Sequence, residues 1–275
     1  MYTQRSKYWP AYTWKIQTLY SSSIKGKLSD ELIISETEFE KIYFDIFNKI
    51  NASFYHLERL KANEEFAVRL GEELAKIKLP GTEGMVGIVG SPYEPIEYEY
   101  EAFLATIKSA LDFTSILMAK GLGRKEDDIV SFTNNIQQDS SNKSTLKVEI
   151  YELLCSQKYK TFIDEYKGNK SGSKSKRNFA THQGSLPIGT INIPINNPHQ
   201  ALLLSKTLDP NNPNPHVSIR TSQNLIEYCE EQFYLACDLL TDILSLISNN
   251  KFKNGPKCSV YQQRVDSVKE KSAKE

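Results

Sequence analysis

The chain has 275 residues, of which 39% are hydrophobic and 25% charged, a composition that supports a packed core and argues against global disorder. Lys and Arg together number 34, as do Asp and Glu, which argues against a broad DNA-coating surface but leaves room for a small basic cleft. The first residues show no apolar signal core, and no later apolar run has the length of a membrane span, so we expect a cytoplasmic protein.

Residues 1–35 are rich in aromatic side chains. Trp14, Ile16 and Thr18 alternate with polar neighbours, a pattern typical of a short strand. We expect an arm that packs on the main body of the protein. The alternative is an aromatic platform on which nucleobases stack.

The first strong helix is predicted to begin near Ser35. Ser35 and Glu38 form a capping-box arrangement, and Leu79-Pro80-Gly81 stops the helix after about Lys78. Apolar residues recur at helical spacing between these two points. They are Phe39, Ile42, Tyr43, Ile46, Phe47, Ile50, Phe54 and Leu57.

A second helix is predicted over about 96–120, with Gly121 and Gly123 as its C-terminal stop. Its apolar face comprises Phe103, Ile107, Leu111, Thr114 and Met118. The preceding residues 80–95 fit a loop or a short strand, and the polar residues 124–144 fit a loop with one helical turn.

A third helix is predicted over about 145–166, and a short helix resumes near Ser173. Residues 185–220 carry isoleucines among Gly, Pro and Asn, which suggests a short strand or hairpin. The last helix, about 222–248, has the broadest apolar stripe. Its members are Leu225, Cys229, Ala236, Leu239, Leu240, Ile243, Leu244 and Ile247.

These elements predict an all-α fold, a bundle of four to five helices with a small β-hairpin decoration. The hairpin lies between the short helix and the last long helix. The predicted organisation is an aromatic-rich arm over 1–35, a bundle over 36–248 with a strand-like insertion at 185–220, and a polar flexible tail over 249–275.

The four cysteines include no C-x-x-C pair. Cys155, Cys229 and Cys237 fall on predicted helix faces, where we expect them to be small core residues. No spacing of histidines and carboxylates offers a metal site, so no metal and no cofactor is predicted.

The string Arg177-Asn178-Phe179-Ala180-Thr181-His182 carries three groups that RNA cleavage needs. The Arg177 guanidinium can hold a phosphate, and the His182 imidazole can move a proton near neutral pH. The Asn178 amide, one helical turn before His182, can orient the imidazole. Attack by an RNA 2′-hydroxyl on the neighbouring phosphate requires this set of groups and no metal.

Arg177 and His182 are five residues apart, about 140° around an ideal helix. The helix must therefore end near Thr181 for them to share a site, unless two copies of the motif meet across a dimer axis. Alternatively, His182 simply lies at a helix C-terminus, near the last carbonyl groups. Lys170, Lys174 and Lys176 precede the motif in a basic run suited to binding RNA.

This motif, Arg177-Asn178-x-x-x-His182 between the third and last helices of a bundle, resembles that of the HEPN superfamily. The resemblance spans roughly 36–248 and is specific over the six motif residues. It implies a metal-independent endoribonuclease that acts as a homodimer, with two motifs facing one composite cleft. Arg177 and His182 would be catalytic and Asn178 a supporting residue. Many members of the family are toxins or antiviral, anti-phage defence effectors.

The expected function is therefore that of a HEPN-type ribonuclease with RNA as substrate. An antitoxin or regulatory protein is an additional expected partner. The alternative is a non-catalytic helical interaction or nucleotide-binding module in a defence or regulatory complex. His56 is expected to be structural, and Glu97, Glu99 and Glu101 to form a solvated helix start.

Overall fold

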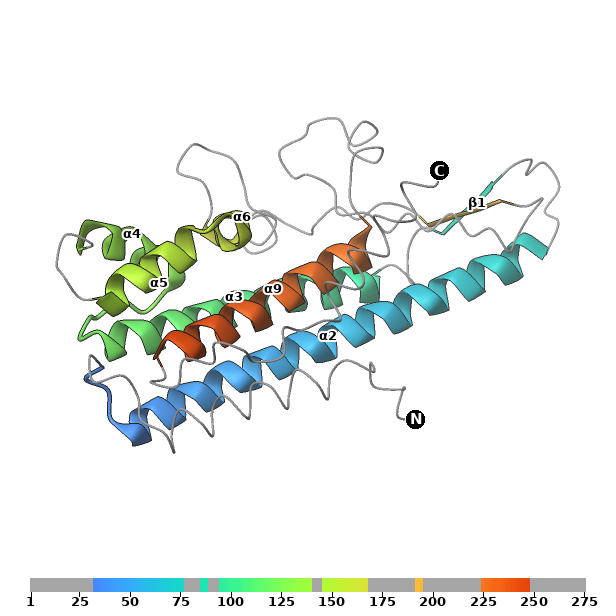
Figure 1. The fold of residues 1–275 in the computed structure, drawn as a ribbon. Helices are drawn as coiled ribbons and strands as arrows, with labels where there is room; N and C mark the ends of the chain where they lie inside the picture. The colour runs from blue at the N-terminus through green and yellow to red at the C-terminus, as the bar shows by residue number, and fades with distance from the viewer. Residues whose placement is uncertain are drawn as a thin grey trace. The chain divides into compact units, whose positions relative to one another are not determined.

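The computed structural model describes residues 32–76, 85–88, 94–139, 145–167, 191–194 and 224–247. These residues are mostly helical, which confirms the all-α fold class (Figure 1). Residues 33–239 form one compact unit, and residues 1–32 with 240–275 form a second. Of the second unit the structure describes Leu32 and residues 240–247, in which Leu240, Ile243, Leu244 and Ile247 are buried. Residues 1–31 of the predicted arm and all of the predicted tail lie outside the described residues.

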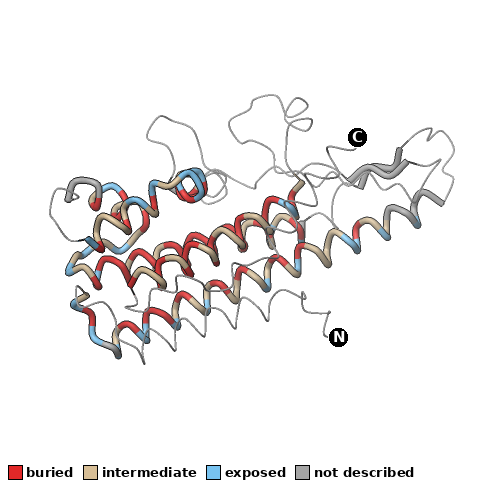
Figure 2. The backbone as a smooth tube through the Cα atoms, viewed as in Figure 1, coloured by how far each residue is buried: buried red, intermediate tan, exposed pale blue. Residues whose placement is uncertain are grey.

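Helix α2 (Glu36–Lys76) begins where the sequence predicts. The Ser35 hydroxyl accepts a hydrogen bond from the backbone N–H of Glu38 at 3.3 Å, and the Ser35 carbonyl accepts one from Phe39 at 2.9 Å. Ser35 therefore caps the helix. The predicted apolar face is confirmed, because Phe39, Ile42, Tyr43, Ile46, Ile50 and Leu57 are buried, with Phe47 and Phe54 partly buried at its edge (Figure 2).

Helix α3 (Glu94–Gly121) runs antiparallel to α2. The Ser53 hydroxyl donates to Thr106 at 3.1 Å. Glu38, in the first turn of α2, forms an ion pair with Lys120, in the last turn of α3. The beginning of α2 therefore lies beside the end of α3. All five residues of the predicted apolar face of α3 are buried, so this helix lies in the core of the 33–239 unit.

The end of α3 is closed by Gly123, as the sequence predicts. Gly123 has φ +70°, in the left-handed region that favours glycine. The backbone N–H of Arg124 donates to the Ala119 carbonyl at 2.7 Å, and that of Gly123 donates to Lys120 at 3.1 Å. This pair of bonds forms a Schellman motif and satisfies carbonyl groups of the last turn.

Replacing Gly123 with Ala is expected to lower the free energy of unfolding by about 1 kcal/mol, because Ala resists the left-handed conformation. The new Cβ would also lie 2.6 Å from Ile33 Cδ1, so that side chain would have to move. Thermal unfolding measures the loss. Gly123→Asn is the control with a smaller expected loss, since Asn tolerates this conformation. Equal unfolding temperatures for Gly123→Ala and the wild type would contradict the prediction.

Residues 124–144 differ from the predicted loop with one turn, because they contain the 11-residue helix α4 (Ile129–Asp139). The Asp128 carboxylate caps α4 by accepting hydrogen bonds from the backbone N–H groups of Val130 at 2.8 Å and Ser131 at 2.9 Å. Three apolar side chains on one face, Ile129, Phe132 and Ile136, are fully buried. This buried face stabilises α4 despite its polar composition.

The predicted third helix is divided into α5 (Thr145–Cys155) and α6 (Gln157–Lys167). The break falls at Ser156, whose carbonyl accepts the first hydrogen bonds of α6. Cys155 at the end of α5 is exposed, so its predicted place in the core was wrong. The short helix predicted near Ser173 lies outside the described residues.

Helix α9 (Leu225–Ile247) is capped by Asn224, whose side-chain oxygen accepts from the backbone N–H of Ile226 at 2.9 Å. Every residue of its predicted apolar stripe is buried. Cys229 and Cys237 are both buried, so their predicted place in the core is confirmed.

Within the 33–239 unit, α9 runs antiparallel to α2 (Figure 1). Lys61 pairs with Glu230 at 2.9 Å, and the rings of Phe54 and Phe233 lie 5.7 Å apart. Helix α6 is also antiparallel to α9, because Lys158 at its beginning pairs with Asp238 at 3.1 Å, while its end meets the first turn of α9. The helical bundle thus comprises α2, α3, α6 and α9, with α4 and α5 beside it.

Two short strands, β1 (Met85–Ile88) and β2 (Ile191–Pro194), pair antiparallel. Met85 is opposite Pro194, and Ile88 is opposite Ile191. The hairpin predicted within 185–220 is not confirmed, because the described strand of that segment pairs with β1, about a hundred residues earlier in the chain.

Candidate functional site

The residues predicted to cleave and bind RNA all belong to the connection between α6 and α9. They are Arg177, Asn178, His182, Lys170, Lys174 and Lys176. All six lie outside the described residues, so their roles remain predictions. The described residues nevertheless define where this connection leaves the bundle and where it rejoins it.

The two ends of the connection are held together. The Tyr228 hydroxyl, in the first turn of α9, donates to Glu165 Oε1, in the last turn of α6, at 3.2 Å. The ring of Tyr228 also meets that of Tyr100 in the second turn of α3, with centroids 6.3 Å apart and planes at 84°. The connection that carries the predicted motif therefore starts and ends at one end of the bundle.

A cluster of buried tyrosines lies at this end of the bundle. Tyr100, Tyr166 and Tyr228 are 1%, 1% and 4% exposed. The hydroxyls of Tyr100 and Tyr166 have no hydrogen-bond partner among the described residues. A buried hydroxyl without a partner lacks the hydrogen bonds that water provides in the unfolded chain, so these two groups are available donors for a water, a ligand or another segment of the chain.

The tyrosine cluster carries no charge at neutral pH. Burial, with added effects of Cys229 and Glu165, raises the pKa of both Tyr100 and Tyr166 well above the ordinary value. Burial likewise raises the pKa of Tyr228. The cluster can therefore donate hydrogen bonds but cannot act as a base near pH 7. No local pattern marks these tyrosines, which come from three separate helices.

Tyr100→Phe and Tyr166→Phe are expected to leave stability unchanged or to raise it by up to about 1 kcal/mol, because each removes a hydroxyl without a partner. Tyr228→Phe is the matched comparison and is expected to lose about 1.5 kcal/mol with its bond to a carboxylate. Urea unfolding measures all three. A loss in Tyr100→Phe as large as that in Tyr228→Phe would show that the Tyr100 hydroxyl has a partner elsewhere in the chain.

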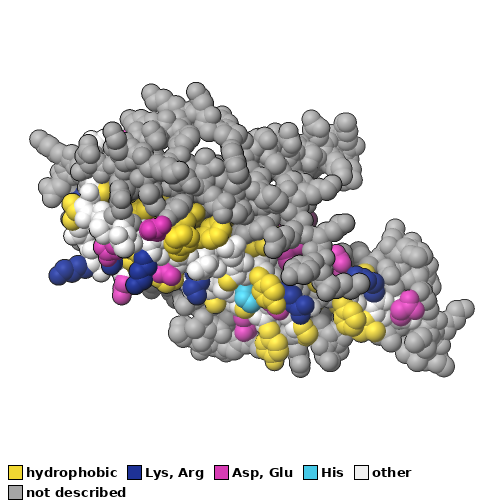
Figure 3. Space-filling view, turned by 90° about the horizontal axis from the view of Figure 1, so that it is seen from below, with side chains coloured by type: hydrophobic (Ala, Val, Ile, Leu, Met, Phe, Trp, Pro, Cys, Tyr) yellow, Lys and Arg dark blue, Asp and Glu magenta, His cyan; other side chains and the backbone are white. Residues whose placement is uncertain are grey.

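A second polar group joins α2 to α3 at the surface. Glu99 accepts from His56 Nδ1 at 2.7 Å and pairs with Arg59 Nε at 3.5 Å. The His56 and Glu99 side chains are 22% and 18% exposed, with the more exposed rings of Tyr55 and Tyr98 as sequence neighbours. Figure 3 shows an exposed face on which hydrophobic, positively charged and histidine side chains lie close together.

The carboxylate of Glu99 fixes the orientation of the His56 imidazole. His56 thus contributes to the α2–α3 contact, in line with its expected structural role. The expectation for Glu99 was wrong, because this side chain is mostly buried against α2 rather than solvated at the start of the helix. The partner is 43 residues away in sequence and is not predictable from the local charge pattern.

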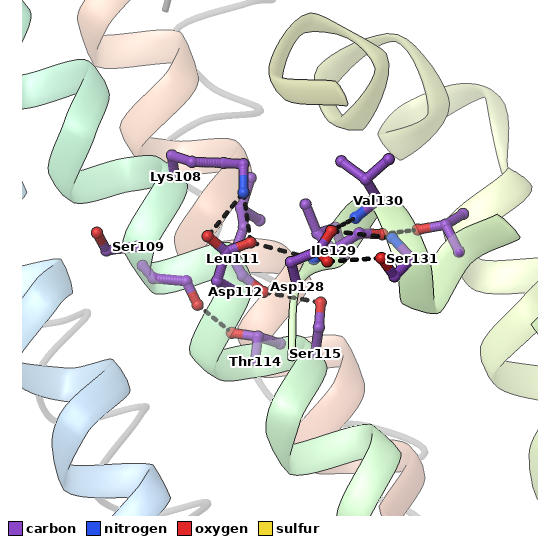
Figure 4. Close-up of polar contacts among 12 residues, drawn as sticks. Lys108, Ser109, Leu111, Asp112, Thr114, Ser115, Asp128, Ile129, Val130 and Ser131 are labelled. Atoms are coloured by element: carbon purple, nitrogen blue, oxygen red, sulfur yellow. Dashed lines mark hydrogen bonds and ion pairs between the residues drawn. The ribbon is translucent and has the colours of Figure 1, made fainter. Parts of the chain in front are cut away.

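A third polar network ties α3 to the start of α4 (Figure 4). Lys108 Nζ donates to both Asp112 oxygens, at 2.5 and 2.6 Å, and only 10% of its side chain is exposed. Asp112 also accepts from the backbone N–H of Ile129 at 3.1 Å. The negative carboxylate therefore lies at the positive N-terminal end of α4.

Asp128 completes this network. Burial opposes its ionisation, but hydrogen bonds from Ser131 and Val130, and nearby Lys108, outweigh burial and lower the pKa of Asp128. Asp112 and Asp128 are both engaged by helix donors and a lysine, so this network stabilises the α3–α4 junction rather than forming a reactive site.

No group of three or more His, Cys, Asp or Glu side chains within the described ranges is placed to hold a metal ion. The tyrosine cluster is consequently the group of described residues best placed to contribute to a site, since it combines available donors with the ends of the connection that carries Arg177 and His182.

In the part of the chain that the structure describes, one helix has the length and apolar composition of a membrane span, the stretch Pro95–Gly121 of α3. More than half of its most apolar window is buried by the rest of the protein. The core helices of soluble proteins show the same combination, because a helix that is apolar around most of its circumference is covered by its neighbours. The sequence analysis predicted that no apolar run has the length of a membrane span, and for α3 this prediction was wrong.

Comparisons with known proteins give no assignment for this chain. No family model, no curated protein and no solved structure matches it.

Proposed function

We propose that this protein is a metal-independent endoribonuclease of the HEPN type that acts as a toxin or anti-phage defence effector in the cytoplasm. The observation that carries the proposal is the position of the motif in the chain. Arg177, Asn178 and His182 belong to the connection whose two ends are joined by the Tyr228–Glu165 hydrogen bond at one end of a helical bundle.

Each proposed catalytic residue supplies one part of the reaction. His182 takes the proton from the attacking 2′-hydroxyl or gives one to the leaving oxygen. Arg177 holds the phosphate through its planar guanidinium and offsets the charge that develops on it. Asn178 orients the imidazole. The reaction leaves a 2′,3′-cyclic phosphate on one product and a 5′-hydroxyl on the other.

The basic run before the motif binds the RNA backbone in this proposal. Lys170, Lys174 and Lys176 attract phosphates locally, although the whole chain has no net charge. The proposed active form is a homodimer with two motifs in one cleft, restrained in the cell by an antitoxin or a regulatory protein.

The proposal is tested by incubating the protein with total RNA and with tRNA, with and without EDTA. Cleavage that EDTA does not reduce, with cyclic-phosphate ends, is the expected result. Cleavage that stops in EDTA, or products with 5′-phosphate ends, would contradict the proposed chemistry. The ends are mapped by ligation-dependent sequencing before and after removal of the cyclic phosphate.

A second candidate function is a non-catalytic interaction or nucleotide-binding module. It is favoured by the available donors of Tyr100 and Tyr166, which suit a bound ligand as well as a substrate. Absence of RNA cleavage, combined with a nucleotide-dependent rise in thermal stability, would favour this candidate.

A further inference from the structure

We infer that the outer face of the α2–α3 pair binds single-stranded RNA, by stacking unpaired bases on exposed aromatic rings around Arg59. Three aromatic side chains on this face, Tyr55, Phe66 and Tyr98, are 58%, 60% and 65% exposed. The Arg59 side chain is 52% exposed. These four residues form what we call the Arg59 surface.

The α2 residues of the Arg59 surface follow one side of the helix. Arg59 comes four residues after Tyr55 and seven residues before Phe66, which is about one turn and about two turns of an α-helix. Side chains at these spacings lie on the same face of a helix. Tyr55 and Phe66 therefore flank Arg59, at about 6 Å and about 10 Å along the helix axis.

Tyr98 adds a third ring from the neighbouring helix α3. It directly precedes Glu99, whose carboxylate accepts from His56 Nδ1 at 2.7 Å and lies 3.5 Å from Arg59 Nε. The His56 ring in turn meets the ring of Tyr55, with centroids 5.3 Å apart and planes at 75°. These contacts bring the α3 part of the surface beside the α2 part, on the face where Figure 3 shows hydrophobic and basic side chains together.

The Arg59 surface combines stacking area with a positive charge. Three aromatic side chains with these exposures offer roughly 350 Å² of apolar surface, within the range of the largest patch on a typical monomer. The described contact of Arg59 with Glu99 uses Nε, so both terminal NH2 groups of the guanidinium can face a ligand. Only 18% of the Glu99 side chain is exposed, so the charge presented to solvent is mainly that of the arginine.

This surface lies at the end of the bundle where the connection with the predicted motif begins and ends. Tyr98 and Tyr100 are two residues apart on α3, about 200° around the helix, so they lie on opposite sides of it. Tyr100 meets Tyr228 in the first turn of α9, and Tyr228 bonds to Glu165 in the last turn of α6. RNA bound at Tyr98 is therefore level with both ends of the connection.

Unpaired RNA bases are the ligand that fits this composition. Bases in loops and single strands stack on aromatic rings and on arginine, whereas the bases of a duplex are covered by their neighbours. A stacked base contributes to affinity through its ring face, which agrees with a chain of zero net charge. RNA as the ligand rests on the proposed function, and this surface adds that the recognised RNA is single-stranded.

Fluorescence anisotropy with a labelled single strand of about 12 nucleotides, within the site sizes of single-strand binders, tests this surface. All proteins carry His182→Ala, so that the proposed cleavage does not consume the RNA. Tyr98→Ala is expected to weaken binding about tenfold, an ordinary effect of losing one stacked base. Tyr98→Phe keeps the ring and should bind as the His182→Ala protein does. Ile33→Ala is the matched control, because it removes a 74% exposed apolar side chain beside the end of α3.

The salt dependence of binding separates the arginine from the rings. Arg59→Gln is expected to lower the slope of the logarithm of the binding constant against the logarithm of salt concentration by about 0.7, the contribution of one phosphate contact on a single strand. Tyr98→Ala should leave this slope unchanged, because stacking releases no counterions. An unchanged slope in Arg59→Gln would show that this arginine holds no phosphate.

Equal affinities of Tyr98→Ala and the His182→Ala protein, with the same unfolding temperature, would overturn the inference. So would a protein that binds no single strand, or an equal loss by Tyr98→Ala of affinity for a duplex. Cleavage is measured separately with His182 in place. Cleavage combined with binding that ignores Tyr98 removes this surface and keeps the proposed chemistry, whereas Tyr98-dependent binding without cleavage does the reverse.

Discussion

Replacing Asp112 with Ala is expected to lower the free energy of unfolding by about 3 kcal/mol, because the Lys108 ammonium would remain buried without its partner. Lys108 is 8% exposed, and both of its hydrogen bonds described here go to Asp112. The change also removes the acceptor for the backbone N–H of Ile129 and weakens the start of α4. Chemical denaturation followed by circular dichroism measures the loss.

A double-mutant cycle separates the two contributions. Lys108→Met in combination with Asp112→Ala is expected to recover much of the loss, since the unpaired charge is gone and the methionine fills the same space. Asp112→Asn keeps an acceptor for Ile129 and should fall between Asp112→Ala and the wild type. If the double variant is no more stable than Asp112→Ala, the loss does not come from the buried lysine.

The helices that the sequence predicts well are those with a long apolar stripe and a clear cap. Helix α2 begins after Ser35 as predicted, and the stripe of α9 is buried throughout. Helix α4 was missed because Asn134, Asn135 and their neighbours make its composition polar. Its signals were nevertheless present, in the Asp128 cap and in apolar residues at helical spacing. The break at Ser156 has no such signal, because no Gly or Pro lies between Thr145 and Lys167. The buried face nevertheless turns there, from Leu146 and Leu154 in α5 to Tyr159 and Phe162 in α6.

The polar contacts of the bundle were much less predictable. His56 and Glu99 are 43 residues apart, and Tyr228 and Glu165 are 63 residues apart, so only the packing of whole helices brings them together. A local charge pattern shows which side chains are available but not which helix faces meet. The opposite holds for the motif of Arg177 and His182. The sequence defines this motif, whereas the described residues define only the two ends of the connection that carries it.

Replacing His182 with Ala is expected to reduce RNA cleavage by at least about 100-fold, the usual contribution of one general acid or base, without unfolding the protein. The folded bundle should survive because its described core lies in α2, α3, α6 and α9, outside the connection that carries His182. Cleavage of tRNA in EDTA under single-turnover conditions measures the rate, and thermal unfolding monitors the fold.

His216→Ala is the matched control, because it removes the same side chain from the same connection. It should cleave at the wild-type rate. Charge reversal at Lys174 and Lys176 should instead weaken RNA binding in a salt-dependent way and leave the rate at saturating RNA near that of the wild type. Cleavage that survives in His182→Ala would show that the imidazole takes no part in proton transfer, and the proposed assignment of the motif would then be wrong.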